Sequence, residues 1–312
     1  MKFITPSATI LESKGILKDI ELAARTCYQS QGKISEDNSS AVALVKNIVK
    51  REHYAMLEFG QNINISLTAP DCNYVFIRFR YEPLFKAINF QYAPFQRTII
   101  SINPRTALEM IESLEEYGDI GKTGTLCKLY NTLVSTLPKE LVGDRLLQYN
   151  ENGDYLFLSD HIVCGLGDIE TVTVKFICDR GVSHELVRHR HCSFAQKSTR
   201  YCDENGKEIE FILPCWVPQY FQNVGDATAF RKLKSGLTYI ETLYKDLRAY
   251  GWKPEEARAI LPNSLSTEIV VKTSLQEWKH MFGLRCDKAA HPQMRELMIA
   301  LREDFFTRGL LE

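Results

Sequence analysis

The residues best suited to chemistry lie in one short segment, residues 188–201, with the sequence RHRHCSFAQKSTRY. The segment contains no acidic residue, although the whole chain is nearly neutral. Its four cations are Arg188, Arg190, Lys197 and Arg200. Ser198 and Thr199 add neutral hydroxyl donors, and the guanidinium fork of arginine matches phosphate oxygens and planar carbonyl edges. Because so many like charges repel one another, the segment is predicted to bind an anion.

Other interpretations of the same segment are open at this point. A run of charges is more often a solvated basic loop that binds nothing. His189, His191 and Cys192 have the side chains of metal ligands, but the neighbouring arginines would repel a divalent cation and no carboxylate balances them. No metal site is therefore predicted. Cys192 beside His191 could also be an activated thiol, although no third group that would orient the pair is visible.

The composition of the 312-residue chain limits the class of protein. Hydrophobic residues make up 45% and charged residues 25%, as in ordinary globular proteins, which excludes disorder and fibrous architecture. The formal net charge is −1, so binding to nucleic acid or to an anionic membrane surface is not expected. No run of about 18 apolar residues predicts a membrane span, and the first residues do not resemble a signal peptide.

Nine cysteines are scattered along the chain without CxxC pairs. A zinc site would need closely spaced ligands, and a disulfide framework would need an even number of cysteines in a short chain. We therefore expect reduced, buried thiols and a cytoplasmic location. The two commonest nucleotide-binding loops, GxGxxG and GxxxxGK[ST], are absent from the sequence.

The elements that must position the basic segment can be predicted from periodicity. Apolar residues at helical spacing predict helices over residues 16–27 and 41–48, and strict alternation predicts strands with one wet face over 61–67 and 171–176. Local signals predict further elements. The first are a helix from Asn103-Pro104 to near Gly118, a turn at 179–181 before a short helix capped by Ser183, and a strand at 209–213. Further along are a long helix with Asp226 as its N-cap and Gly251 beyond its end, a helix between Pro254 and Pro262, a helix capped by Ser274, and a last helix from Pro292. Helices mixed irregularly with such strands predict an α+β fold, with an antiparallel sheet packed with helices.

The basic segment resembles the RHRxxSxxxxSxR signature of flavin-dependent thymidylate synthases. The matching positions are Arg188, His189, Arg190, Ser193, Ser198 and Arg200. Two more blocks are similar to the family: AARTCY at 23–28 with His53 and Glu58 behind it, and ARAILP at 257–262 followed by Trp278, Leu284-Arg285 and His291. The resemblance covers roughly residues 1–60 and 170–312. It predicts a single domain over 1–312, with an insertion at about 61–170.

The resemblance implies an activity and a set of site residues. The family is a methyltransferase family that makes dTMP from dUMP, with methylenetetrahydrofolate as carbon donor and FAD reduced by NADPH. The implied dUMP-binding residues are Glu185, Arg188, Gln196, Ser198, Arg200, Arg258 and Arg285. The implied FAD-binding residues are Arg188, His189, Arg190, Gln196, Ser274, Gln276, His280 and His291. Arg285 is the implied catalytic residue, because a permanently protonated guanidinium can stabilise uracil with its N3 proton lost. On this route no cysteine nucleophile is required.

The resemblance also implies a cytoplasmic homotetramer whose sites are shared between subunits and whose partners are the small molecules dUMP and folate. Six positions depart from the common pattern. Ala195 stands where many members have Asn, Gln196 replaces Glu, Ser274 replaces Asn, Gln276 replaces Arg, Ala55 replaces a hydroxyl residue and Phe59 replaces a histidine. Two alternatives are a non-catalytic module that binds nucleotide or RNA through the arginine-rich loop, and a degenerate family member that binds its ligands without turnover.

Overall fold

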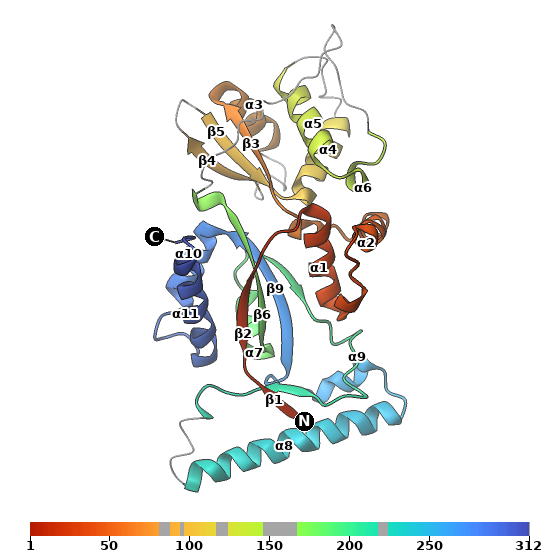
Figure 1. Ribbon diagram of the computed structural model, residues 1–312, viewed down its shortest axis with the longest axis vertical. Coiled ribbons are helices and arrows are strands. Elements are labelled where there is room, and N and C mark those ends of the chain that lie inside the picture. The colour runs from red at the N-terminus through yellow and green to blue at the C-terminus, as the bar shows by residue number, and fades with distance from the viewer. Residues whose placement is uncertain (81–87, 94–96, 117–123, 146–166, 218–223, 312) are drawn as a thin grey trace.

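The computed structural model describes residues 1–80, 88–93, 97–116, 124–145, 167–217 and 224–311 (Figure 1). Its central element is a four-stranded sheet in the order β2-β6-β9-β7, in which every neighbouring pair is antiparallel. The strands are β2 (Ser7–Leu11), β6 (Thr171–Asp179), β7 (Ser193–Gln196) and β9 (Ser266–Ser274). The predicted α+β class with an antiparallel sheet packed with helices is confirmed. One small departure is the parallel pair of β1 (Lys2–Ile4) with β8 (Glu210–Ile212).

The two faces of this sheet are covered by different helices, as Figure 1 shows. On one face lie α7 (Arg180–Leu186), α10 (Leu275–Arg285) and α11 (Pro292–Thr307). Their core packs Phe176 and Val271 of the sheet against Trp278, Met298 and Phe305. The opposite face packs against α1 (Ile16–Tyr28) and the 3-10 helix η2 (Tyr54–Phe59). Helices therefore pack against both faces of the sheet.

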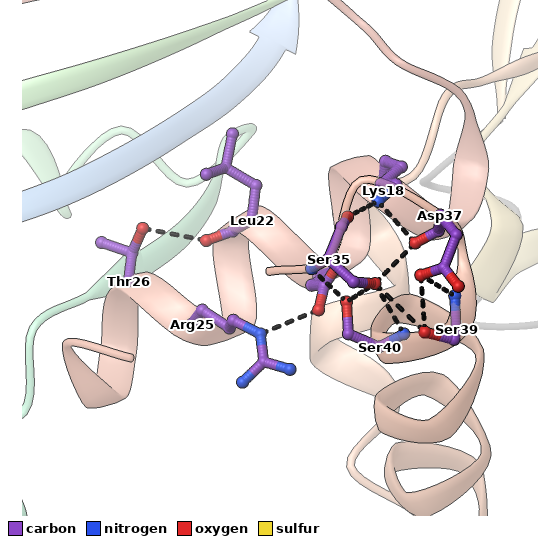
Figure 2. A network of polar contacts seen from close by, with 9 residues as sticks. Lys18, Leu22, Arg25, Thr26, Ser35, Asp37, Ser39 and Ser40 are labelled. Carbon is purple, nitrogen blue, oxygen red and sulfur yellow. Dashed lines mark hydrogen bonds and ion pairs between the residues drawn. The ribbon is translucent and has the colours of Figure 1, made fainter. Parts of the chain in front are cut away.

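Helix α1 and the helix α2 (Ser39–Lys50) confirm the two helices predicted from apolar spacing. Between them lies the 3-10 helix η1 (Gln31–Lys33) and a loop that polar contacts hold to α1 (Figure 2). Lys18 Nζ donates to the carbonyl oxygens of Ser35, at 2.5 Å, and Asp37, at 3.2 Å. The hydroxyl groups of Ser35 and Ser40 lie 2.8 Å apart, which ties the loop to the first turn of α2.

Residues 63–142 form a second sheet, in the order β3-β5-β4, with its own helices. The elements are β3 (Ile63–Thr68), α3 (Ala69–Phe79), β4 (Asn89–Ala93), β5 (Arg97–Ile102), α4 (Pro104–Glu116), α5 (Thr125–Thr136) and α6 (Lys139–Val142). Strand β3 confirms the predicted alternation, because Ile63, Ile65 and Leu67 are all buried. The hydrophobic core of this unit also includes Ile20 of α1 and Val45 of α2. The segment predicted as an insertion therefore has its own sheet but shares a core with the N-terminal helices.

The remaining elements are the 3-10 helix η4 (Gly167–Ile169), the long helix α8 (Val224–Ala249), the short helix α9 (Pro254–Ala257) and the 3-10 helix η6 (Arg258–Ile260). Helix α8 packs its buried residues Leu237 and Tyr244 against Phe211 of β8. The strand predicted at 209–213 and the helices predicted after Ser274 and from Pro292 are confirmed.

Three local predictions were wrong. The predicted turn at 179–181 is the first turn of α7, and its cap is Asp179, whose Oδ1 accepts from the backbone N–H of Val182 at 2.7 Å. Ser183 lies inside that helix and donates to the carbonyl of Arg180. Helix α8 begins at Val224, two residues before the predicted cap, and the helix after Pro254 turns into 3-10 geometry at Arg258. Gly118 lies outside the described residues, but α4 begins at Pro104 as predicted.

Candidate active site

The loop between α7 and β7 carries Arg188, His189 and Arg190. The hydroxyl of Thr273, on β9, donates to the carbonyl of His191 at 2.8 Å and fixes the end of this loop. Arg188 and Arg190 are exposed. Within the described part of the chain neither side chain forms a hydrogen bond or an ion pair, so both guanidinium groups are available to a ligand.

Arg285, the last residue of α10, lies beside this loop and is bound on three sides. Its Nη1 donates to Glu185 Oε2 at 2.8 Å and its Nη2 to the Glu185 carbonyl at 3.1 Å. Its Nε lies 3.0 Å from Nε2 of His189. Glu185 comes from α7 and His189 from the loop that follows it, so a helix end, a second helix and a loop converge on one guanidinium. The partner of Arg285 is thus Glu185, and its planar fork is held in a fixed orientation.

His189 is only 7% exposed and is predicted to be neutral. Burial, with the charge of Arg285 and the neighbouring His280, lowers the pKa of His189 to about 4. Because Nε2 accepts the hydrogen bond from Arg285, the proton of the neutral ring is assigned to Nδ1. Nδ1 faces Glu277 Oε1 at 3.6 Å, and the ring of His280 lies edge-on to that of His189 with centroids 6.3 Å apart.

His189, Glu277 and His280 place potential ligand atoms within 4.8 Å of one another. A metal needs a lone pair, whereas the Nδ1 atom that faces Glu277 carries the ring proton in this arrangement. Arg285 also places a positive charge against the opposite ring nitrogen. The geometry therefore favours a hydrogen-bonded imidazole over a metal ligand at His189.

The neutral state of His189 predicts a pH dependence. Its folded-state pKa of about 4 lies below the ordinary value of 6.5, so the unfolded chain binds the proton more tightly. This histidine therefore stabilises the fold above about pH 6.5, and that contribution is lost as the pH falls toward 4. NMR titration should find the His189 ring neutral at pH 5.5. In the variant His189→Gln, the unfolding free energy should depend less on pH between pH 4 and 6.5. A ring that titrates near 6.5 would contradict the assignment.

Gln196, at the end of β7, is turned toward α7. Its Nε2 donates to Ser183 Oγ at 2.8 Å and to Thr267 Oγ1, on β9, at 3.2 Å. Ser198 follows β7, and its backbone N–H donates to the carbonyl of Cys27 at the end of α1, at 2.9 Å. Its hydroxyl accepts from the backbone N–H of Arg200 at 3.3 Å. These bonds set the direction in which the segment leaves the sheet.

A second cluster holds Arg200 and Arg258, both exposed. Arg200 Nε donates to Glu255 Oε2 at 3.1 Å, and its guanidinium lies over the ring of Tyr201, 5.1 Å from the centroid. Arg258 Nη1 donates to Thr199 Oγ1 at 3.2 Å. Among the described residues, no hydrogen bond or ion pair joins this cluster to Arg285 and its partners.

The fold supplies carboxylates that the basic segment itself lacks. Lys197 Nζ lies 2.6 Å from Glu204 Oε1, and both side chains are largely buried, so Lys197 points away from any ligand. Glu255 similarly faces Arg200. Among the described residues of the segment, Arg188 and Arg190 are therefore the cations that no carboxylate opposes. Arg200 is opposed by Glu255, but this ion pair is exposed to solvent.

Of the other residues implied for FAD, Ser274 caps α10 and its hydroxyl accepts from the backbone N–H of Glu277 at 3.3 Å. Gln276 and His280 are exposed on the same helix, and His280 reaches the Arg285 cluster through His189. His291 is exposed at the start of α11, where its ring lies edge-on to Trp216 at 5.9 Å. Among the described residues, no hydrogen bond, ion pair or ring contact joins His291 to His189 or Arg285.

Sequence reasoning missed two carboxylates of the site. Glu277 lies at Nδ1 of His189, and Glu58 Oε2 accepts from the hydroxyl of Ser193 at 2.6 Å. Glu58 is 135 residues from Ser193, so spacing could not pair them. The available signals were the position of Glu58 in a block similar to the family and the capping-box spacing of Glu277 after Ser274.

The cysteine next to the loop is expected to be inert. Burial raises the pKa of Cys192 to about 12, and its Sγ lies 3.7 Å from Met281 Sδ. Burial also raises the pKa of Cys286. Since the thiolate is the nucleophile, Cys192→Ala and Cys286→Ala should each keep the dTMP formation that the family resemblance implies within about threefold of the unchanged protein. If either variant folds and binds both ligands but forms no dTMP, the result would favour covalent catalysis by that cysteine.

Comparison with known proteins finds one family that this part of the chain resembles. Residues 168–307, which carry both arginine clusters, match the family described as thymidylate synthase complementing protein. The resemblance seen in the signature is confirmed over that region. Similarity to the family over residues 1–60 stays a prediction.

The relatives are named flavin-dependent thymidylate synthases. The chain is 35% identical to that of Pyrococcus furiosus over 133 residues, covering 42% of this chain and 52% of the relative. It is 34% identical to that of Geobacter sulfurreducens over 124 residues, or 39% and 50% of the two chains. It is 33% identical to that of Mycobacterium sp. strain KMS over 156 residues, or 44% and 60%. The chain thus spans about half the length of the curated relatives it matches. None of the described helices is both long and apolar enough to span a membrane.

Proposed function

We propose that this protein is a flavin-dependent thymidylate synthase, which methylates dUMP reductively to dTMP with methylenetetrahydrofolate as carbon donor and FAD reduced by NADPH. The observation that carries the proposal is the convergence of Arg285, Glu185 and His189 beside Arg188 and Arg190. This cluster lies within the region that matches the family.

The donor set suits a flavin. The pyrimidine edge of a reduced flavin carries negative charge, and the exposed guanidinium groups of Arg188 and Arg190 have no described protein partner that would compete for it. When bound, the flavin supplies the hydride that completes the methyl group. We propose that His189 lines it as a neutral imidazole, so that two of the three signature residues contribute charge. The other FAD-binding residues proposed are Gln196, Ser274, Gln276, His280 and His291.

For dUMP we propose that Arg200, Ser198 and Arg258 hold the phosphate. A phosphate dianion needs at least one guanidinium with donor-rich neighbours, which this cluster offers. The Arg200–Glu255 ion pair is exposed on both sides, so its rupture costs only about 0–1 kcal/mol. Glu185, Arg188, Gln196 and Arg285 are the residues proposed for the nucleoside.

The chemical role proposed for Arg285 follows from its three bonds. Glu185 and His189 accept one hydrogen bond from each of its three nitrogens, so the N–H groups that are not used point in a fixed direction. Arginine stays protonated, so these donors can stabilise uracil that has lost its N3 proton. The negative charge raises electron density at C5, the carbon that must attack. Because the donors are already oriented, little reorganisation is needed during the reaction.

The assembly is also a proposal. The two arginine clusters share no hydrogen bond within the described part of one chain, which fits sites shared between the subunits of a cytoplasmic homotetramer. We propose that the chain is one domain over residues 1–312, because the core of residues 63–142 continues into α1 and α2. Its expected partners are dUMP and folate, not nucleic acid or membrane.

The test uses the purified full chain. A flavin absorption spectrum that NADPH bleaches under anaerobic conditions, followed by dTMP formation from dUMP and methylenetetrahydrofolate, is the expected result. A protein that binds dUMP and flavin without forming dTMP is instead a degenerate family member. A protein that retains no flavin and binds RNA is a non-catalytic module, and either outcome overturns the proposed reaction.

A further inference from the structure

The unit formed by residues 63–142 touches the candidate site through one carboxylate. Arg105, on α4, donates from Nη1 to Glu58 Oε1 at 2.7 Å. The other oxygen of the same carboxylate accepts from the hydroxyl of Ser193 at 2.6 Å. Ser193 is the first residue of β7 and lies three residues after Arg190. Glu58 therefore bridges a helix of this unit to the strand that follows the signature loop.

The backbone of Glu58 is fixed independently of its side chain. Lys272 lies opposite Ser193 in the register of β9 and β7, and it is only 6% exposed. Its Nζ donates to the carbonyl of Glu58 at 3.0 Å, to the carbonyl of Gly60 at 2.5 Å and to Asn62 Oδ1 at 2.7 Å. All three donors of a buried ammonium are thus used to hold residues 58–62 against the central strand.

The start of α4 lies close to the same backbone. A Cβ added to Gly60 would come 2.8 Å from Pro104 Cγ and 3.0 Å from Ile16 Cγ2. Asn62 Nδ2 also donates to Ser101 Oγ, on β5, at 3.0 Å. Arg105 follows Pro104 directly, so close packing sets the position from which its side chain reaches Glu58. A second partner of Arg105, Glu109, lies one turn further along α4 at 2.8 Å.

We propose that Arg105 is a positioning residue for the signature loop and that it acts through Glu58 on Ser193. The carboxylate of Glu58 accepts one bond from each side, so its orientation is defined only while Arg105 holds the oxygen that Ser193 does not use. Loss of Arg105 leaves that oxygen without its charged donor, and the anchor of β7 is weakened. The proposal rests on the proposed function, because it assigns the unit of residues 63–142 the task of holding Arg188, His189 and Arg190 in a flavin-binding geometry.

The test compares Arg105→Met with two controls. Glu109→Gln removes the charge of the other partner of Arg105. Tyr130→Phe removes the hydrogen bond from Tyr130 to Glu115 in the same unit, a bond that involves neither Arg105 nor Glu58. The first readout is amide hydrogen exchange of residues 192–196 in the ligand-free protein, which needs no flavin. We expect about three- to tenfold faster exchange in Arg105→Met and less than twofold change in both controls.

The second readout is the dissociation constant for FAD at a temperature where every variant is folded. Arg105→Met and Ser193→Ala should each weaken FAD binding by about three- to tenfold, and the double variant should be no weaker than the worse single variant. If the factors by which the two substitutions weaken FAD binding multiply in the double variant, Arg105 does not act through the bond from Ser193 to Glu58. Faster exchange without weaker FAD binding, or the reverse, would also overturn the proposal. If the unchanged protein binds no FAD, the proposed function fails, and the exchange experiment then decides alone whether Arg105 anchors β7.

Discussion

Replacing Arg285 with lysine should lower the rate of dTMP formation by about 10²–10³-fold while the protein still folds and binds FAD. Lysine keeps the positive charge and can still pair with Glu185. It cannot make the three bonds that Arg285 makes to the Glu185 carboxylate, the Glu185 carbonyl and His189 Nε2, and it lacks the planar fork needed to bridge two uracil atoms. The measurement is anaerobic single turnover of the reduced enzyme with dUMP and methylenetetrahydrofolate.

The matched control is Arg295→Lys, on α11. Arg295 is also half-buried, and its Nε donates to the carbonyl of Cys286, one residue after Arg285, at 3.5 Å. This variant should turn over at the rate of the unchanged protein. An Arg285→Lys rate within a few-fold of that value would mean that Arg285 only ties α10 to α7 and takes no part in the chemistry.

Replacing Arg200 with alanine should weaken dUMP binding about tenfold to a hundredfold and leave FAD binding nearly unchanged. A charge-assisted bond to phosphate contributes about 1.5–3 kcal/mol, and each 1.4 kcal/mol is a factor of ten in the dissociation constant. Arg200 is exposed beside Ser198 and its described acidic partner is Glu255, so its guanidinium can turn to a phosphate. Titration of dUMP and of deoxyuridine isolates the phosphate, because only dUMP should bind more weakly to the variant.

Glu255→Gln serves as the opposite control. It removes the carboxylate that competes with phosphate for Arg200, so dUMP should bind as tightly as before or a few-fold more tightly. If Arg200→Ala binds dUMP with an unchanged dissociation constant, the phosphate lies elsewhere. If it weakens dUMP and deoxyuridine equally, Arg200 supports the fold of the site and does not contact the phosphate.

Elements could be predicted from the sequence where one of their faces is exposed to solvent. Strand β6 was found from its alternation, because Val172, Val174 and Phe176 face the core while their neighbours remain half-exposed. Strand β9 was missed, although it is central to the sheet. Both of its faces are covered, and Lys272 is buried by three hydrogen-bond acceptors from residues 58–62, so its sequence shows neither alternation nor an uninterrupted apolar run.

Local sequence patterns were enough to predict the signature of arginines and hydroxyls, the helices with 3.6-residue spacing, caps such as Ser274, and the α+β class. These features are local, since they depend on residue types within a few positions of one another. The tertiary structure decided which charges remain free. Glu185 holds Arg285 from 100 residues away, and Glu204 neutralises Lys197. Glu58 accepts hydrogen bonds from Arg105, 47 residues away, and from Ser193, 135 residues away. Such pairs form because strand register and helix packing bring distant side chains within hydrogen-bond distance. They cannot be predicted from the spacing of residues along the chain.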